Sequence, residues 1–436
     1  MRIIKRANME RWSSRTGFIL AAIGSAVGIG NVWRFSSVVG QNGGGAFLIP
    51  YLLAVLLFAV PLMILEMAVG RHFRADVVSC FGRAGEKFKI LGWMICTTLL
   101  LILSYYLVIT GWTMAYLVFS LLDLKIAFSS FTSSLQPVAY FLISALATGV
   151  IVCLGVRAGI EKIVSTLIPF AFLILLILVF FSITLPGFHP GMNFFLSPDF
   201  SMLAHPSVWS AALGQAFFSL SVGMGILITY GAYLDDETDI PQSALVITIA
   251  DLAVAMLAGA YIFSLVFTFG LEPTAGAELA FTTLPEGFEL MPQGRAFSTA
   301  FFALLFSVAI TSAISMMEVI VAAIIRETNM NRTKASIFLT VTIMLIGLPS
   351  CLSYSSVDLN MLGSKILDLM DKTVGTIGLP VAAFLVAVVF RWYTDSDILI
   401  RQVHLTERRL MLLSLLTKYA IPVALLIVTV SRFVGL

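Results

Sequence analysis

Apolar residues dominate this chain in long runs that are separated by short polar segments. Eleven of the runs reach about 20 residues, the length of helix that crosses the hydrocarbon core of a bilayer. They are 16–38, 45–70, 90–122, 138–155, 163–185, 207–233, 242–271, 296–325, 335–352, 366–391 and 411–432. The pattern therefore predicts an all-α polytopic membrane protein with eleven transmembrane helices.

The composition supports a place in the membrane. Of the 436 residues, 59% are hydrophobic and 11% are charged, whereas soluble domains carry about a quarter charged residues. Most of the 26 Lys and Arg residues fall in segment 1–15 and in alternate connections after it. The positive-inside rule then predicts a multi-pass protein of the cell (inner) membrane with a cytoplasmic N-terminus and an extracellular C-terminus. The formal net charge of +2 indicates no nucleic-acid partner, and the four cysteines lack metal-like spacing.

The first span contains a helix-breaking segment at its midpoint, Gly24-Ser25-Ala26-Val27-Gly28-Ile29-Gly30-Asn31. Glycine and asparagine lower helix propensity, and open backbone at membrane depth is tolerated only where protein or a water-filled cavity surrounds it. The free carbonyl and amide groups then become ligands for ions and small polar molecules. The alternative is close helix packing, because small residues let membrane helices approach one another.

A second such segment, Gly223-Met224-Gly225, lies five spans later in the sixth span. Because five is odd, superposing spans 1–5 on spans 6–10 inverts one half relative to the bilayer. Paired broken helices in inverted repeats are typical of secondary transporters with a binding site near the midplane. The chain then divides into a cytoplasmic N-terminal segment 1–15, a first repeat 16–185, a second, inverted repeat 207–391 and an eleventh span 411–432.

Several polar side chains lie deep in the predicted spans, where an unpaired charge is costly. Glu66 in the second span is expected to accept hydrogen bonds from the free amides of a broken helix, with ion binding as its alternative role. Asp251 in the seventh span requires a partner. The eighth span carries a polar stripe along one helical face, with Ser312 beside it: Ser307, Thr311, Ser315 and Glu318. Each hydroxyl of the stripe has the alternative of bonding to its own helix.

Several motifs resemble those of the neurotransmitter:sodium symporter family, most closely of its bacterial amino-acid members. They are Arg11-Trp12, the segment 24–31, Trp33-Arg34-Phe35, the run from Asn42 to Tyr51, and Gly214-Gln215-x-Phe-Phe-Ser-Leu-Ser221. The likeness runs from about Arg11 to Trp392. It implies a LeuT-like fold, a 5+5 inverted repeat with discontinuous spans 1 and 6, followed here by a single further helix.

The resemblance implies two sodium sites. The first would be formed by the Ala26 backbone, the Asn31 amide, Ser219, Asp251 and the substrate carboxylate. The second would be formed by backbone carbonyls and two hydroxyls, from Gly24, Val27, Val308, Thr311 and Ser312. Oxygen ligands alone suit a hard cation, so sodium ions, two in number, are the expected cofactors.

The resemblance also implies a site for an amino acid between the two breaks. The α-carboxylate is expected at the Tyr106 hydroxyl and at the amides of the first break, and the amino group near Ser25, Phe218, Ser219 and Ser221. The amides and other lining groups are those of Ala26, Gly28, Gly30 and Ser312. Side-chain selection is expected from an apolar wall, with Phe218 also acting as a lid: Ile29, Ile102, Ile109, Phe218, Met224 and Met316.

Gate residues match the family only in part. Arg34 and Asp371 match the extracellular gate, and Trp12 and Tyr233 match part of the cytoplasmic gate. Met9 stands where an arginine is usual, and Arg326 stands where an aspartate is usual. Arg11 or Arg6 with Glu327 is the substitute pair that the sequence offers.

These observations predict a sodium-coupled symporter of neutral hydrophobic, aliphatic and aromatic, L-amino acids that works by alternating access. We expect it to be chloride-independent, because Asp251 supplies a fixed negative charge beside the first sodium, and we expect no enzymatic activity. Two alternatives stay open. An ion channel would require a continuous polar pathway, and a non-transporting amino-acid receptor would share all the site residues. The sequence predicts neither the preferred amino acid nor the oligomeric state.

Overall fold

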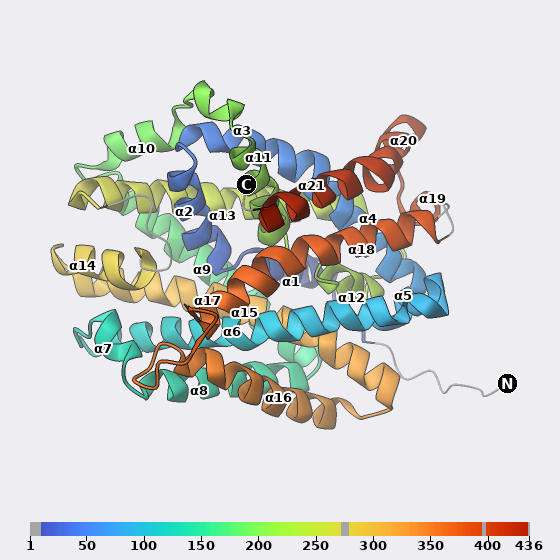
Figure 1. Cartoon of the computed structure of the whole chain (residues 1–436), viewed down its shortest axis with the longest axis horizontal. Coiled ribbons are helices and arrows are strands. Elements are labelled where there is room, and N and C mark those ends of the chain that lie inside the picture. Colours follow the sequence, from blue (N-terminus) through green and yellow to red (C-terminus); the bar gives the residue numbers. More distant parts are fainter. Residues whose placement is uncertain (1–9, 272–278, 395–397, 435–436) are drawn as a thin grey trace.

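The structure is a computed structural model that describes residues 10–271, 279–394 and 398–434, and it is a bundle of helices (Figure 1). Nine helices in the described ranges are long and apolar enough to cross a membrane: Gly45–Phe73, Glu86–Leu121, Gln136–Cys153, Val156–Ser182, Ile240–Phe269, Gly294–Thr328, Arg332–Leu352, Ile366–Trp392 and Glu407–Ser431. They agree with nine of the eleven predicted spans to within a few residues.

The two remaining predicted spans are broken. The first consists of Arg15–Ala26 (α1) and Gly30–Gln41, which meet at an angle of 53°; the second piece ends in α2 (Phe35–Gln41). The sixth consists of α11 (Pro206–Ser219) and α12 (Ile226–Ala232), with an open segment between them. The two breaks therefore lie in the two spans for which the sequence predicted them.

The long spans contain the following helices: α3 (Leu48–Ala54), α4 (Val60–Phe73), α6 (Lys89–Leu121), α8 (Gln136–Cys153), α9 (Lys162–Ser182), α13 (Ile240–Phe269), α15 (Gly294–Thr328), α16 (Arg332–Leu352), α17 (Ile366–Met370), α18 (Leu379–Trp392), α20 (Glu407–Leu415) and α21 (Ile421–Val434). Shorter elements connect them: α5 (Val77–Ala84), α7 (Phe128–Thr132), α10 (Phe188–Leu196), α14 (Leu284–Glu289), α19 (Ile398–Gln402), and the strands β1 (Asn360–Met361) and β2 (Ser364–Lys365), which pair antiparallel.

Local sequence determines where several helices begin. Ser14, Asp76, Asp239 and Asn331 are the N-caps of α1, α5, α13 and α16, and each side chain accepts a hydrogen bond from a backbone amide three residues later. Such a cap satisfies one of the free amides of the first turn. At the other end of α13, Gly270 adopts a left-handed conformation with φ 64°, which ends the helix at low conformational cost.

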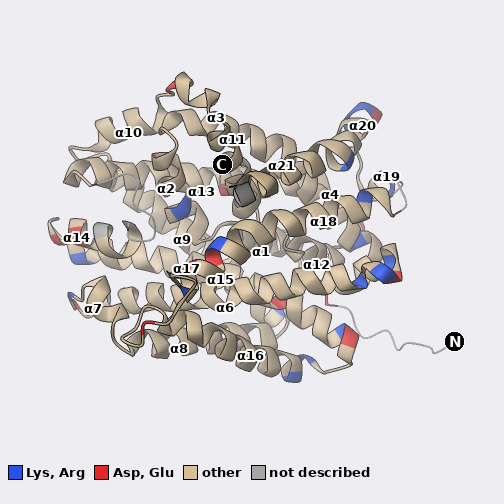
Figure 2. Ribbon diagram, viewed as in Figure 1, with Lys and Arg blue, Asp and Glu red and all other residues tan. Residues whose placement is uncertain are grey.

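Helices α6 and α15 lie at the centre of the bundle and α9 lies at its edge. In the most apolar window of each span, 89% of the residues are buried in Gly294–Thr328, which is α15, and 72% in Glu86–Leu121, which contains α6. In Val156–Ser182, which contains α9, only 28% are buried. Charged residues gather mostly toward the two ends of the bundle (Figure 2). The few polar groups at the centre are those of the two breaks and of the helices that pack on them.

Candidate functional site

The first break leaves several carbonyl groups without helical partners. Helix α1 ends at Ala26, Val27 is extended with φ −72° and ψ 106°, and the next helical turn begins at Gly30. The carbonyls of Gly24, Ser25 and Val27 all face the hydroxyl of Ser312 on α15, at 3.3, 3.4 and 3.4 Å. The break therefore presents backbone oxygen to the centre of the protein.

The second break is held open by backbone conformation. Ser221, Gly223 and Gly225 have φ values of 52°, 85° and 74°, a region that favours glycine. A Cβ atom on Gly223 would lie 2.7 Å from the Cα of Ala383 on α18, so a larger residue at this position would displace the helix. The Gly223 amide donates to Glu66 Oε1 at 2.5 Å, which confirms that Glu66 accepts a hydrogen bond from a broken helix. The two breaks touch, because Ser221 Oγ donates to the Ser25 carbonyl at 2.9 Å.

Asp251 lies at the centre of a compact polar cluster. It is fully buried and accepts hydrogen bonds from Asn31 Nδ2 at 2.6 Å and from Ser219 Oγ at 2.8 Å. Asn31 Nδ2 also contacts Ser219 Oγ at 2.9 Å, and Asn31 Oδ1 accepts from the Gly28 amide at 3.0 Å. Residues from α13, from both sides of the first break and from α11 therefore meet here. This arrangement gives Asp251 the partners that the sequence required.

Helix α15 supplies a second cluster of oxygen atoms. Ser312 Oγ lies 3.1 Å from the Val308 carbonyl in addition to the three carbonyls of the first break, and Thr311 Oγ1 donates to the Val308 carbonyl at 3.1 Å. One hydroxyl hydrogen cannot satisfy four carbonyls. Carbonyl acceptors therefore outnumber donors in this cluster. The described residues contain no group of three or more His, Cys, Asp or Glu that could hold a metal ion.

All but one of the apolar side chains of the expected wall are buried. Ile29, Ile102, Ile109, Met224 and Met316 are at most 9% exposed. Phe218 is half-buried and lies over the first break, since a Cβ atom on Gly30 would lie 2.5 Å from its ring. Tyr106 lies near Gly28, where an added Cβ atom would be 3.3 Å from its hydroxyl. The buried Ser25 hydroxyl has no hydrogen-bond partner among the described residues.

The expected outer gate is not joined by an ion pair. The Arg34 guanidinium lies over the Phe218 ring, 4.3 Å from its centroid, and Asp371 accepts a hydrogen bond from the Tyr105 hydroxyl at 3.0 Å. No ion pair between Arg34 and Asp371 occurs among the described residues. Arg34 therefore stacks on Phe218, and Asp371 is hydrogen-bonded to Tyr105. The sequence did not assign Tyr105 to the gate.

Trp12 precedes α1 and packs against the end of α12. It is 4% exposed and its Nε1 donates to the Tyr230 carbonyl at 3.1 Å. Its ring packs against Tyr230 and Tyr233 with centroid distances of 4.9 and 6.1 Å. The Tyr233 hydroxyl in turn donates to Glu318 on α15 at 2.8 Å. These contacts join the start of α1 to α12 and α15.

A buried charge network continues from Glu318. Arg332, at the start of α16, forms an ion pair with Glu318 and a second one with Glu10 at 3.3 Å. Its Nε also donates to the Val152 carbonyl at 2.8 Å. Glu10 and Arg332 were not among the predicted gate residues. One feature of the sequence pointed to this network: Glu318 belongs to the polar stripe of a membrane span, where a carboxylate requires a basic partner.

The substitute pair that the sequence offered for the cytoplasmic gate is wrong for Arg11. Arg11 lies 3.9 Å from Asp235, whereas Glu327 pairs with Lys89 at 2.7 Å. Met9 and Arg6 lie outside the described residues. Arg326 pairs with Asp76 at 3.8 Å. Burial raises the pKa of the Asp76 carboxyl, and hydrogen bonds from Ser79 and the charge of Arg326 lower it in part.

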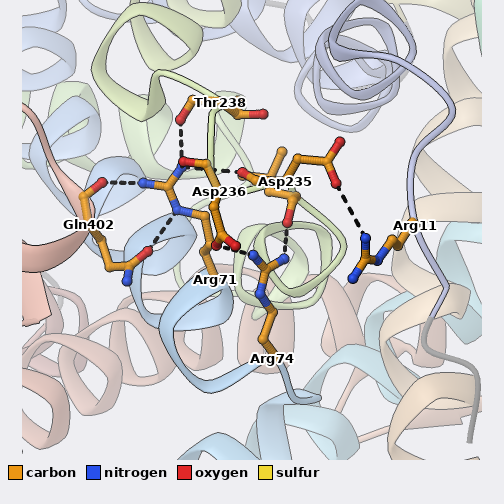
Figure 3. Close-up of polar contacts among 8 residues, drawn as sticks. Arg11, Arg71, Arg74, Asp235, Asp236, Thr238 and Gln402 are labelled. Atoms are coloured by element: carbon orange, nitrogen blue, oxygen red, sulfur yellow. Dashed lines mark hydrogen bonds and ion pairs between the residues drawn. The ribbon is translucent and has the colours of Figure 1, made fainter.

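A separate set of arginine contacts ties the connection between α12 and α13 to its surroundings (Figure 3). Arg71 on α4 donates to the Thr238 carbonyl and to both oxygens of Gln402 on α19, the side-chain oxygen at 2.7 Å. Arg74 pairs with the Asp236 carboxylate. Arginine suits such a site because its guanidinium presents several donors in one plane.

The fold and this site define a class of protein, a polytopic membrane protein with a closed central site between two broken helices. A family model described as the sodium:neurotransmitter symporter family matches residues 9–136 and 124–436. The chain belongs to this family. It is therefore a sodium-dependent membrane transporter and not an enzyme, as the sequence predicted.

Individual relatives agree with the family. An uncharacterized sodium-dependent transporter of Bacillus subtilis is 37% identical over 391 residues, which cover 87% of this chain and 86% of that protein. A sodium-dependent dopamine transporter of Caenorhabditis elegans is 27% identical over 418 residues and covers 78% of this chain and 68% of that protein. A crystal structure of MhsT in complex with L-phenylalanine superposes with a TM-score of 0.90 at 39% identity, and covers 97% of this chain and 100% of that one. The predicted LeuT-like fold is confirmed by this match.

Proposed function

We propose that this protein is a sodium-coupled symporter of neutral hydrophobic L-amino acids, which binds its substrate together with two sodium ions between the two broken helices. The observation that carries the proposal is the excess of oxygen acceptors at the first break. Four carbonyl oxygens lie within 3.4 Å of the single Ser312 hydroxyl. Such a set of neutral oxygen atoms suits a monovalent hard cation.

The second sodium ion of the proposal binds at this position. Its ligands are the carbonyls of Gly24, Val27 and Val308 and the hydroxyls of Thr311 and Ser312. Sodium there would join α1 to α15 and so stabilise one arrangement of the two helices. Loss of the ion would leave the Gly24 and Val27 carbonyl oxygens with the Ser312 hydroxyl as their neighbouring side-chain donor.

The first sodium ion of the proposal binds beside Asp251. The Asn31 amide nitrogen donates to both Asp251 and Ser219, so the buried carboxylate has neutral donors beside it and a cation would complete the site. With sodium bound, the Asn31 oxygen would face the ion together with the Ala26 carbonyl, Ser219 and Asp251. Since Asp251 supplies a negative charge there, we propose that transport does not depend on chloride.

The proposed substrate is an amino acid whose side chain is apolar. The wall formed by the isoleucines and methionines offers no partner for a buried charge, which is costly to desolvate. Met224 is flexible and adapts to side chains of different shape. The Ser25 hydroxyl, which has no partner among the described residues, is available to the substrate amino group. The L-phenylalanine bound to the similar protein MhsT supports this class of substrate.

Contacts on the two sides of the proposed site support alternating access. We propose that Arg34, Phe218, Tyr105 and Asp371 open and close the extracellular side. Trp12 and the network of Glu318 and Arg332 would open and close the cytoplasmic side, with the N-terminus in the cytoplasm. Phe218 lies over the site and Trp12 is buried below it, so the closed arrangement favours a transporter over an ion channel.

Transport in proteoliposomes tests the proposal. Purified protein should accumulate labelled leucine or phenylalanine when sodium is outside, and should not do so when potassium replaces it. Methionine and tryptophan should compete, whereas glutamate and lysine should not. Binding without accumulation would indicate the receptor, and sodium current without amino acid would indicate the channel. Met224→Phe should shift preference toward smaller side chains, and competition by lysine equal to that of leucine would refute the apolar wall.

A further inference from the structure

Two cavities of opposite character meet at Arg295, away from the candidate site. One has a volume of about 290 Å³ and lies among the end of α6, α14 and the start of α15. The other has a volume of about 530 Å³ and lies between α9 and α15. Arg295 lines both. This part of the bundle is the end opposite to α5 and α19, and Figure 1 shows α14 there beside the start of α15.

The larger cavity is an apolar groove that opens to the membrane. Its walls are Phe170 and Ile174 on α9 and a row of small residues on α15, Ala296, Ala300 and Ala303. Phe170 is 47% exposed, so the groove faces outward rather than into the core. From Arg295 to Ala303 the helix rises about 12 Å. The groove therefore runs from the end of the span toward the middle of the bilayer, the depth at which the upper part of an acyl chain lies.

The smaller cavity is lined by charges of both signs. Asp123, Lys125, Glu289 and Arg295 all face it, and Figure 2 shows acidic and basic residues together at α14. Lys125 and Glu289 form an ion pair of 3.8 Å. Arg295 donates to the Leu121 carbonyl at 2.5 Å, and within the described ranges neither Arg295 nor Asp123 has an oppositely charged partner. The Arg295 guanidinium and the Asp123 carboxylate are therefore both available to bind charged groups of a ligand.

We infer that these two cavities together bind one phospholipid with a phosphoethanolamine headgroup. An acyl chain lies in the groove along α15, the phosphate binds the Arg295 guanidinium, and the ammonium group binds Asp123 and Glu289. Guanidinium is well suited to phosphate, since it offers several donors in a fixed plane. A primary ammonium donates three hydrogen bonds, which carboxylates accept. Phosphatidylglycerol would leave Asp123 without a cation, and the quaternary ammonium of phosphatidylcholine has no hydrogen to donate.

Native mass spectrometry of the delipidated full-length protein tests this inference. The protein is titrated in detergent with phosphatidylethanolamine, phosphatidylglycerol and phosphatidylcholine of the same acyl chains. We expect one molecule of phosphatidylethanolamine to bind about tenfold more tightly than either of the others, the effect of one well-placed ionic hydrogen bond. Equal binding of the three lipids would overturn the proposed headgroup contacts, and would leave only non-selective lipid at the surface.

Variants distinguish the contacts of the lipid headgroup from those of the acyl chain. Arg295→Gln should weaken all three lipids, whereas Asp123→Asn combined with Glu289→Gln should remove the preference for phosphatidylethanolamine alone. Ala300→Phe should fill the groove and abolish the tight site. Two controls should leave it intact: Lys365→Gln, which removes a charge from another connection, and Ala139→Phe, on the exposed face of α8. Tight binding that survives both Arg295→Gln and Ala300→Phe would refute the site. Sodium-dependent binding of amino acid to each variant reports whether it is folded.

Discussion

The substitution Asp251→Asn tests the first sodium site most directly. Asparagine keeps the size of the side chain and one oxygen ligand but removes the charge. At an effective dielectric constant of about 20, a unit charge about 4 Å from the ion contributes about 4 kcal/mol. The retained oxygen recovers part of this energy, so we expect a loss of about 2 to 3 kcal/mol, or roughly 30- to 150-fold in sodium affinity.

The same substitution should introduce a chloride effect. With the negative charge gone, one of the two carboxylate oxygens that now accept from the Asn31 amide nitrogen and the Ser219 hydroxyl, at 2.6 and 2.8 Å, is lost. Tyr51 contacts Ser219 at 3.4 Å, and Gln215 lies nearby with its Nε2 3.4 Å from the Gly30 carbonyl. Several donors then converge on one place without a negative partner, which is the chemistry of an anion site.

Equilibrium binding of a labelled amino acid at varied sodium concentration measures the first effect. Uptake with chloride or with gluconate measures the second. In the unmutated protein we expect gluconate to change nothing, and in Asp251→Asn we expect chloride to restore part of the uptake. Asp199→Asn, in an exposed connection, is the matched control and should behave as the unmutated protein. An Asp251→Asn protein with sodium affinity within twofold of normal would refute the assignment, as would strong chloride dependence without any mutation.

Three further predictions rest on other contacts. Gly30→Ala should push the Phe218 ring away, because the new Cβ atom would lie 2.5 Å from it; we expect at least tenfold weaker substrate binding in a scintillation proximity assay. Gly82→Ala is the control, because a Cβ atom there would meet its nearest neighbours at 3.8 Å. Asp371→Ala should reduce uptake at least tenfold and leave equilibrium binding within threefold, because it removes the partner of Tyr105 outside the site; an equal loss of both would contradict a gating role. Asp76→Asn should change the pH dependence of stability. Because burial raises the Asp76 pKa above 3.8, the folded protein holds this proton more tightly than the unfolded chain. The stabilisation of the fold by this proton is fully present below pH 3.8 and is lost as pH rises through the raised pKa. The unfolding temperature, measured in detergent, should therefore fall less steeply over that pH range in the variant.

Much of the fold could be predicted because membrane helices need long apolar runs and the two breaks interrupt such runs with glycine. The nine unbroken spans were located within a few residues by hydrophobicity alone. The role of Glu66 could also be predicted, since a carboxylate at that depth must have donors and a broken helix offers free amides. The 53° bend could not be predicted, because it depends on how α1 and the following turn pack against α13 and α15.

Side-chain partners across the bundle were harder to predict. The pair Arg34 and Asp371 has the expected charges, yet Arg34 stacks on Phe218 and Asp371 accepts from Tyr105. A motif specifies which residues line a passage, but the conformation decides which of them touch. Arg11 was likewise a reasonable partner for Glu327 by charge. Glu327 instead forms an ion pair with Lys89, because α6 lies beside α15.

The network of Glu10, Glu318 and Arg332 shows how a departure from the family pattern can be accommodated. A position that usually carries an aspartate here carries Arg326, which would repel an arginine at the N-terminus. In this protein the acidic group comes from the N-terminal segment instead, as Glu10, and the basic group comes from α16, as Arg332. Arg332 also neutralises the buried Glu318, which would be costly if left alone. We therefore propose that opening at this end separates Glu10 from Arg332 while Glu318 stays paired, in a movement in which the segment before α1 and α1 itself leave while α15 and α16 stay together.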